Sequence, residues 1–454
     1  MVKNTISKMF LFLMLFCFKS GGQSIAQDVE KYRRSSLSLI LINNEGLGEQ
    51  KDLIINSFNN NPFPDKYNRH NINLSNCEIN KVKLSTSDYI DNGWYVDTLR
   101  TMKEFFSAMK KINNSIRYIK ADSSEALLEP NDGQINQMKL DKFVKENELA
   151  KKNIATWFNR DPYTGKMDWE LIKERGMYSA NSEQIEQAET VADQTSFLLD
   201  FDLIGNTYSV FNSLSFYPNE PIAASIRDKA KESAIQKFAG KPEILLTKSL
   251  ALIDSVYERT KEGYTVKCNT YLYKLIWNDD IANKTKLYFF NDNIDSKVAW
   301  DTTSIFQMEF LGKVSSSSLV TFKIGEQRTE SEIIDLQIKR TVDNALAKLQ
   351  KEYVQFRPVS PIYSTEPVTA KIGLKEGVEP KQKFEILEMS FNEIGIPEWK
   401  NVGNVSVDKN AIIWDNRQGS EIQSDEEGNA LPSYTIFSGG KKAISGLHYI
   451  RLIK

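Results

Sequence analysis

The chain is poor in the residues that most catalytic and metal sites use. It has two histidines and three cysteines in 454 residues, and the histidines, His70 and His448, lie near opposite ends. Two isolated histidines do not build a multi-histidine zinc site, and general-base chemistry most often relies on histidine. The chain also lacks Cys-x-x-Cys, His-Glu-x-x-His, Gly-x-Ser-x-Gly and a glycine-rich phosphate loop. We therefore expect no metal site and no cofactor, although carboxylate-only catalysis stays open.

An excess of charge of one sign is also missing. The chain has 58 basic and 60 acidic residues, a formal charge of −2. A mildly acidic chain lacks the basic footprint that binds nucleic acid or anionic lipid. Partners must therefore be recognised by shape and by local chemistry.

Long apolar runs are absent except for a short one at the N-terminus. Lys3 and Lys8 precede the apolar run 9–18, and Ser24 and Ala26 place small residues before Gln27. This order is typical of a cleavable signal peptide, residues 1–26, with cleavage between Ala26 and Gln27. The run of about ten residues is too short for a spanning helix, which needs about 20, and we expect no transmembrane span in the mature chain.

Two alternatives to a released protein stay open. One is a permanent membrane anchor, which the shortness of the apolar run disfavours. The other is a lipid anchor on Cys17, which lies inside the apolar run and follows Phe16, where such a site prefers a small side chain. Loss of Lys3, Lys8 and Lys19 with the signal peptide takes the formal charge from −2 to −5.

Only Cys77 and Cys268 remain after cleavage. In an oxidising compartment these two residues are a possible disulfide. The alternative is that both are buried thiols that pack as small apolar groups. Their separation in the sequence leaves the choice to the structure.

Residues 27–160 are predicted to form an N-terminal α/β domain. A buried strand is expected at 37–42, a turn at 43–48 and a helix at 49–58, because apolar residues run continuously and then recur at helical spacing. Two further helices are expected at 97–112 and 135–158. The turn residues at 161–165 (DPYTG) indicate the domain boundary.

Residues 161–357 are predicted to form a central α+β domain. Its strands should form an antiparallel sheet, with one helix at 222–238 that ends at Gly240 and Pro242. The predicted strands are 206–217, 263–277 and shorter ones near 285–290, 305–312 and 319–324. Thr329 and Glu332 form a capping box that opens a long helix, which we expect to pack across the sheet.

Residues 358–454 are predicted to form a small β-barrel domain. Glycine and proline become frequent there, and short strands are expected near 383–389, 399–406, 411–415, 433–437 and 446–453. The predicted fold class is therefore α+β and multi-domain.

Asp200 and Asp202 are the best carboxylate candidates for catalysis. They follow an apolar run in the order Asp-x-Asp, as in the first motif of haloacid-dehalogenase-type phosphatases, where the two carboxylates help to bind Mg²⁺. Ile204 stands where that motif has a hydroxyl residue, and no downstream lysine motif follows. The simpler interpretation is a helix end with both carboxylates in water.

Tryptophans offer a second, independent candidate site. An exposed tryptophan can stack on the apolar face of a sugar ring, although packing in the core is the usual role of this residue. The seven tryptophans are scattered along the chain: Trp94, Trp157, Trp169, Trp277, Trp300, Trp399 and Trp414.

Four segments carry a resemblance to a known group of proteins. They are 363–378 (YSTEPVTAKIGLKEGV), 383–388 (KFEILE), 203–208 (LIGNTY) and 414–417 (WDNR). Together they resemble an uncharacterised family of exported bacterial envelope proteins of Bacteroidetes type, over about residues 200–454. The C-terminal part is more loosely similar to the small SH3-like barrels of envelope assembly proteins. The resemblance implies an envelope location and brings no catalytic residue with it.

The sequence thus favours a non-catalytic, exported envelope protein that acts as a binding or assembly factor in the periplasm or at the outer membrane. Its expected partners are other envelope proteins. The alternatives are an exported carboxylate-dependent hydrolase, a phosphatase or a glycosidase, that uses Asp200 and Asp202, and a glycan-binding module.

Overall fold

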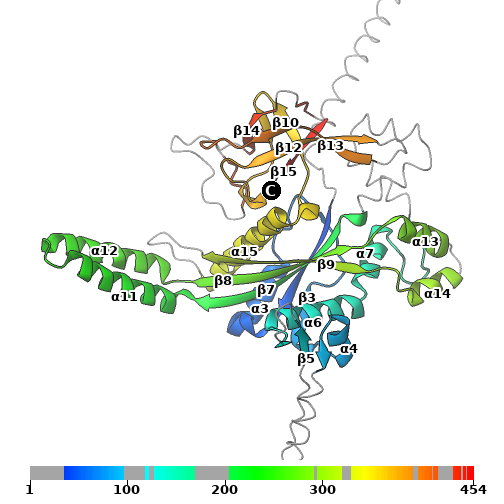
Figure 1. Cartoon of the computed structure of the whole chain (residues 1–454), viewed down its shortest axis with the longest axis horizontal. Helices are drawn as coiled ribbons and strands as arrows, with labels where there is room; N and C mark the ends of the chain where they lie inside the picture. The colour runs from blue at the N-terminus through cyan, green and yellow to red at the C-terminus, as the bar shows by residue number, and fades with distance from the viewer. Residues whose placement is uncertain are drawn as a thin grey trace, which may run out of the picture.

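The computed structural model describes most of the chain between residues 35 and 453. The described residues are 35–96, 118–121, 127–168, 204–290, 294–319, 329–391, 397–411, 413–417, 433–440, 443–445 and 447–453. They form a central mixed sheet, a closed barrel and a long helical hairpin (Figure 1). The α+β, multi-domain fold class is confirmed.

The central sheet has the strand order β2-β1-β7-β8-β9, and β3 pairs with β1 beyond the end of β2. Strand β1 runs parallel to β2, β3 and β7, whereas β7, β8 and β9 form an antiparallel meander. The strands are β1 (Ser36–Asn43), β2 (Asn68–Arg69), β3 (Asn76–Glu78), β7 (Thr207–Pro218), β8 (Tyr264–Leu275) and β9 (Met308–Leu319).

The sequence predicts a domain boundary at residue 160, but the central sheet contains strands from both sides of that boundary. Strand β1, from the predicted N-terminal domain, pairs over seven residues with β7, from the predicted central domain. The pairing buries apolar side chains of both segments in the same core. The two segments are therefore parts of one sheet, because turn residues mark where a chain bends and not where a core ends.

One face of the sheet is covered by helices α15 (Glu330–Glu352) and α3 (Lys51–Asn59). The capping box of α15 is confirmed: Thr329 Oγ1 accepts a hydrogen bond from the amide of Glu332, whose carboxylate accepts one from the amide of Thr329 at 2.8 Å. Ser57 donates to Asp335 at 2.7 Å and joins the two helices. The buried residues of α15 recur at helical spacing and include Ile334, Ile338, Val342, Ala345 and Leu349.

The opposite face is covered by α6 (Asp132–Glu146) and α7 (Leu149–Trp157). The sequence predicts one helix here, but the helix is interrupted at Glu148, whose φ of 50° lies in the left-handed region. Phe143 of α6 packs edge-on against Phe211 of β7, and Phe211 packs against Tyr273 of β8. Beside α7, helices α13 (Asp279–Phe289) and α14 (Ile294–Thr302) close the core around Trp157.

The C-terminal strands close into a six-stranded barrel in the order β10-β11-β14-β13-β12-β15. The barrel strands are β10 (Ser360–Thr365), β11 (Val368–Ala370), β12 (Lys383–Phe391), β13 (Pro397–Ser406), β14 (Thr435–Gly439) and β15 (His448–Leu452). Arg357 joins it to α15, because its guanidinium donates to the carbonyls of Gln350 and Lys351 and to that of Leu452 in β15.

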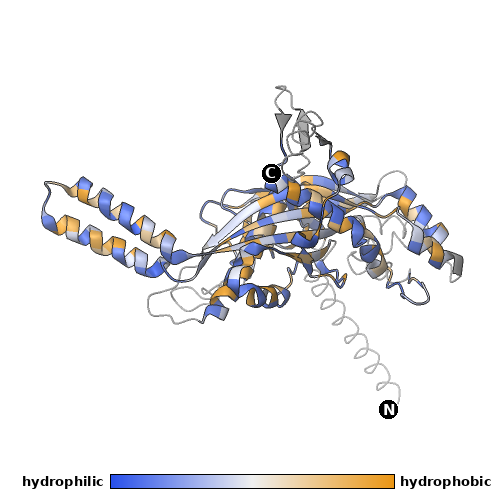
Figure 2. Ribbon diagram, turned by 90° about the horizontal axis from the view of Figure 1, so that it is seen from below, coloured by the Kyte–Doolittle hydropathy of each residue, from blue (hydrophilic) through white to orange (hydrophobic). Residues whose placement is uncertain are grey.

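A helical hairpin, which we call the arm, is inserted between β7 and β8. It consists of α11 (Asn219–Phe238) and α12 (Glu243–Thr260) and projects from one side of the molecule (Figure 1). Figure 2 shows that apolar and polar residues alternate along both of its helices.

The remaining elements are short. They are η1 (Glu45–Gln50), η2 (Ile79–Lys81), α4 (Thr86–Asp91), η3 (Val354–Phe356), η4 (Leu374–Glu376) and a small sheet of β4 (Tyr95–Val96), β5 (Tyr118–Ala121) and β6 (Leu127–Leu128).

Several predicted elements differ from the structure. The strand expected near 285–290 is wrong, since these residues belong largely to α13, which begins where the Asn278 side chain accepts from the amide of Ile281. The strand expected near 305–312 is part of β9, which continues to Leu319, and residues 320–324 of the next predicted strand lie outside the described residues. The described residues of 411–415 form no strand. The helix expected at 97–112 lies outside the described residues.

The packing of α15 on the sheet generates a stability prediction. Ile338→Ala removes a fully buried side chain from the middle of the helix and is expected to lower the free energy of unfolding by about 2–4 kcal/mol. Urea unfolding followed by circular dichroism measures it. Val354→Ala, at an exposed position, is the control and is expected to cost less than about 0.5 kcal/mol. Equal losses in the two variants would contradict the observed packing.

Candidate functional site

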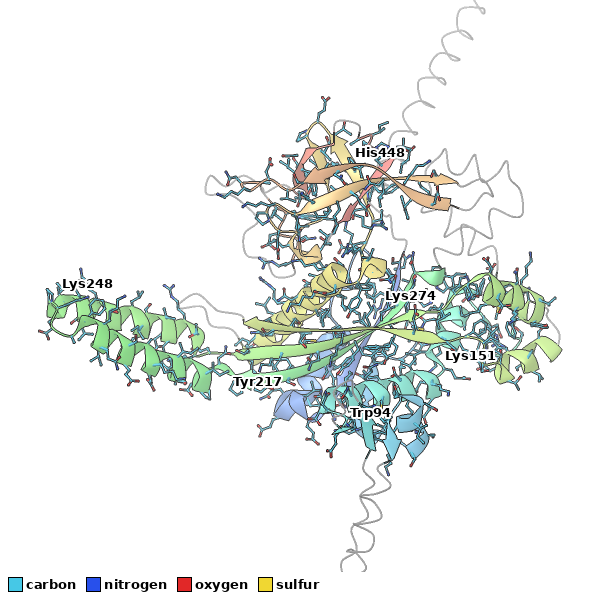
Figure 3. The ribbon with its side chains drawn as sticks, viewed as in Figure 1. Trp94, Lys151, Tyr217, Lys248, Lys274 and His448 are labelled. Carbon is cyan, nitrogen blue, oxygen red and sulfur yellow. The ribbon has the colours of Figure 1, made fainter. Side chains whose placement is uncertain are left out.

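Few residues of the arm are buried, so the arm contributes little to the hydrophobic core. Helix α11 has 20 residues and α12 has 18, so the arm extends by roughly 30 Å at 1.5 Å per residue. Tyr217 marks its base and Lys248 lies toward its far end (Figure 3). No residue of α12 is buried, and only three residues of α11 are.

The base of the arm is held firmly by Asn219, which is buried. Its side-chain amide donates to the carbonyl of Glu262 at 2.8 Å, and its side-chain oxygen accepts from the hydroxyl of Thr265 at 2.8 Å. Its backbone amide donates to the carbonyl of Gly263 at 3.0 Å. These bonds join the start of α11 to the start of β8, so the direction of the arm is set by the sheet.

Polar contacts hold the two helices of the arm together along one side. The Arg227 guanidinium lies 4.3 Å from the ring centre of Tyr257, and the Tyr257 hydroxyl donates to Glu220 at 3.2 Å. Lys231 and Asp254 form an ion pair with a nitrogen–oxygen distance of 2.5 Å. Most of these side chains are only half-buried, and each contact contributes little, about 1 kcal/mol or less.

The arm also presents an apolar groove, which we define by Ile222, Ile226, Leu252 and Val256. The two residues from each helix are four positions apart and therefore share a side of that helix. Ile226 is 61% exposed and Leu252 67% exposed. The groove has a volume of about 370 Å³ and is lined mainly by apolar side chains. A contiguous exposed apolar surface of this kind is typical of an interaction site.

A second cavity, of about 500 Å³, lies between α6, α7 and strands β8 and β9. The Tyr273 hydroxyl donates to the Asp141 carboxylate there at 2.6 Å. Burial raises the pKa of Asp141, although this hydrogen bond opposes the rise, and burial beside Asp141 raises the pKa of Tyr273 as well. Lys151, also in the wall, donates to Glu148 at 2.7 Å and to the carbonyl of Asp301 (Figure 3).

The polar groups of this second cavity thus satisfy one another. Asp141 is paired with a hydroxyl, and Lys151 is paired with a carboxylate. Each of these four side chains, Asp141, Tyr273, Lys151 and Glu148, thus has a hydrogen-bond partner in the cavity wall.

The predicted catalytic pair and the cleavage site lie outside the described residues. This holds for Asp200, Asp202, Ala26 and Gln27, and also for Cys17. Within the described residues, no group of three or more histidine, cysteine, aspartate or glutamate side chains is placed to hold a metal ion. No helix in the described part of the chain is long and apolar enough to cross a membrane.

Cys77 and Cys268 are free, buried thiols. Cys77 lies in the core beneath α6, whereas Cys268 lies in the core beneath α15, so the sheet separates them. Burial raises the pKa of each thiol to about 12, which keeps both protonated at neutral pH. The sequence left two alternatives open, a disulfide or two buried thiols. The structure shows the second, because both thiols are free and pack as small apolar groups.

The two histidines lie in different parts of the fold. His70 is buried beside Trp157, with Nε2 2.9 Å from the carbonyl of Asn153. His448 is in the barrel, where its Nδ1 accepts from the amide of Ile444 and burial lowers the pKa of the ring. Neither belongs to the arm or to the second cavity.

The described tryptophans are all at least partly covered by the fold. Of the six described tryptophans none is exposed: Trp94, Trp157 and Trp300 are buried, and Trp277, Trp399 and Trp414 are half-buried. Trp169 lies outside the described residues. Stacking on a sugar needs an accessible ring face, which among the described tryptophans only the three half-buried ones retain in part.

Sequence reasoning found α11 but assigned no structure to 243–260. The signal was present, because Leu246, Leu250, Ile253 and Tyr257 recur at spacings of three and four. Gly240 and Pro242 indicated the end of one helix and equally the turn before the next. A scan against models of known protein families finds no match for this chain, and neither does a search of curated protein sequences.

The Asp141–Tyr273 pair generates a pH-dependent prediction. Tyr273→Phe removes the hydroxyl that stabilises ionised Asp141, so the pKa of Asp141 rises further above its value in the unfolded chain. The unfolded chain then releases this proton first, and stability falls as the pH rises. We expect a loss of about 1–2 kcal/mol at pH 7.5 that shrinks toward pH 4.

Urea unfolding between pH 4 and pH 8 measures this effect. Tyr271→Phe is the matched control, because Tyr271 is also buried on β8 and its hydroxyl makes no hydrogen bond to a described residue. A loss in Tyr273→Phe that does not change with pH would show that Asp141 is not the group responsible.

Proposed function

We propose that this protein is an exported, non-catalytic binding factor of the bacterial cell envelope, in which the arm docks onto another envelope protein. The observation that carries the proposal is the arm itself: two long helices, firmly anchored at the base, that leave an apolar groove open to solvent. Single exposed apolar residues are common, but apolar residues gathered in one exposed groove indicate an interaction site. Helices that expose apolar residues along one side commonly bind a partner there.

The charge of the arm favours a protein partner over a lipid surface. Residues 219–260 contain seven basic and six acidic residues, a net charge of +1. Binding to an anionic bilayer needs a marked excess of lysine and arginine near the surface. Charges of both signs around an apolar centre are instead typical of the polar rim of a protein interface.

The expected partner presents an apolar surface that fills the groove between α11 and α12. Ile226 and Leu252 come from different helices and both line the groove, so a partner that packs there contacts both helices at once. Anchors that lie near the centre of an interface and lose their water usually carry most of the binding energy.

The docking proposal predicts the effect of a charge in the groove. Ile226→Glu and Leu252→Glu each place a charge where the partner packs, and each is expected to reduce capture of partners at least tenfold. Affinity purification from cross-linked envelopes, with quantitative mass spectrometry, measures the capture. Both side chains are exposed, so the fold and its melting temperature should stay unchanged.

Leu287→Glu on α13 is the matched control for this experiment, because Leu287 is 64% exposed and lies outside the arm. It should capture partners as the wild type does. Recovery of the wild-type protein alone, as a free monomer, would count against the docking proposal. An equal loss of partners in Leu287→Glu would place the binding surface elsewhere.

The export proposal predicts a defined N-terminus. Protein purified from the envelope fraction should begin at Gln27 in intact-mass spectrometry, because Ala26 supplies the small residue before the cleaved bond. Ala26→Trp should leave the precursor uncleaved, whereas Asp28→Ala should be processed normally. Recovery of the full-length wild-type chain from the cytoplasm would contradict the proposal.

A further inference from the structure

A third cavity, of about 370 Å³, lies where the central sheet meets the barrel. Its walls come from the segment before β2, from β8, from the link between α15 and the barrel, and from strands β13 and β15. Lys274, at the end of β8, lies below the barrel in Figure 3. Ligand pockets usually have volumes of roughly 300–1,000 Å³, so this cavity has a volume that suits a small ligand.

The cavity is lined by four cations and by no acidic residue. The cations are Lys66, Lys274, Arg357 and Arg451, which come from four separate segments of the chain. Positive charges that converge in a half-buried cavity repel one another and attract an anion. Burial lowers the pKa of Arg357, and the nearby charge of Arg451 lowers it further, although Glu385 and Glu352 oppose the shift.

The groups around the cavity leave much of this charge uncompensated. Arg451 is paired with Glu385 at 2.7 Å. The Arg357 guanidinium donates to three backbone carbonyls, which satisfy N–H groups but carry no net charge. Among the described residues, no ion pair is made by Lys66 or Lys274, although both are half-buried.

The acidic groups nearest to Lys66 are held by other partners. Asp65 pairs with Lys375 at 3.1 Å. Glu376 accepts from the amide of Gly373 at 2.7 Å and from the Asn416 side chain at 2.8 Å. Neither carboxylate lines the cavity. Both carboxylates act on Lys66 through space without forming an ion pair with it, so they balance its charge only in part.

Neutral polar and aromatic side chains complete the wall. Asn206 and Gln355 offer amide donors and acceptors, and Trp399 offers an apolar surface, with its ring packed edge-on against Tyr449 at 5.2 Å. Amides suit the hydroxyl groups of a sugar, and an aromatic ring suits the apolar face of a sugar. A site for an inorganic ion alone would use the four cations but would have no need of the amides and the aromatic ring.

We propose that the cavity binds a phosphorylated sugar, with the phosphate among the lysines and arginines and the sugar against Trp399. A phosphate monoester carries a charge of about −1.5 to −2 at neutral pH, which suits a site with several uncompensated cations. Because its walls come from both the sheet and the barrel, the bound ligand holds the two together and stabilises the folded chain. The proposal does not depend on the arm.

Calorimetric titration of the full mature chain tests this assignment. The probes are glucose 1-phosphate, inorganic phosphate and glucose. We expect glucose 1-phosphate to bind and to raise the melting temperature. It should bind at least tenfold more tightly than inorganic phosphate, and glucose should not bind. Added salt should weaken the binding, since charge carries much of it.

Lys66→Gln and Lys274→Gln each remove one charge and leave the hydrogen bonds of the fold in place. Each is expected to weaken binding of glucose 1-phosphate at least tenfold, with an unchanged melting temperature in the absence of ligand. Lys248→Gln, toward the far end of the arm, is the control and should bind as the wild type does. Absence of binding, equal affinity for the two phosphates, or wild-type affinity in both cavity variants would overturn the proposal.

Discussion

The antiparallel pairing of β7 with β8 is the contact on which the other parts of the molecule depend. It runs from Tyr208 opposite Lys274 to Pro218 opposite Tyr264. The arm begins at one end of this pair, and the cavity between sheet and barrel lies at the other. The two strands thus place the proposed docking site and the proposed ligand site at opposite ends of one rigid element, roughly 35 Å apart at about 3.3 Å per residue.

The sheet keeps this role because one face of β8 is buried along most of the strand and the other face is buried over the half of the strand beside α6, whereas Lys267 and Asn269 nearer the arm are exposed. Along β8, Val266, Cys268 and Leu272 face the core under α15, and Tyr271 and Tyr273 face the core under α6. The barrel is then joined to the same core through Arg357, whose hydrogen bonds reach α15 on one side and β15 on the other. A strand pair packed against a dense core tolerates little bending, which suits an element that carries an arm.

Local patterns predicted much of this fold correctly. The strand predicted at 263–277 corresponds to β8, and the capping box placed the start of α15 at Thr329. A strand was predicted near 285–290, but the Asn278 cap and the burial of Ile281 and Phe289 fit the observed helix. The domain boundary at residue 160 differed from the structure because a parallel pairing between distant strands leaves no local signal.

The sequence by itself determined the local elements, the absence of histidine-rich and cysteine-rich motifs, and the predicted signal peptide. Each of these depends on residues that are close together in the chain. Only the tertiary structure decided that Lys66, Lys274, Arg357 and Arg451 line one cavity, and that Ile226 and Leu252 share one groove. Such sites form when distant segments meet, and the geometry of that meeting is set by packing of the whole core and not by any pattern along the chain.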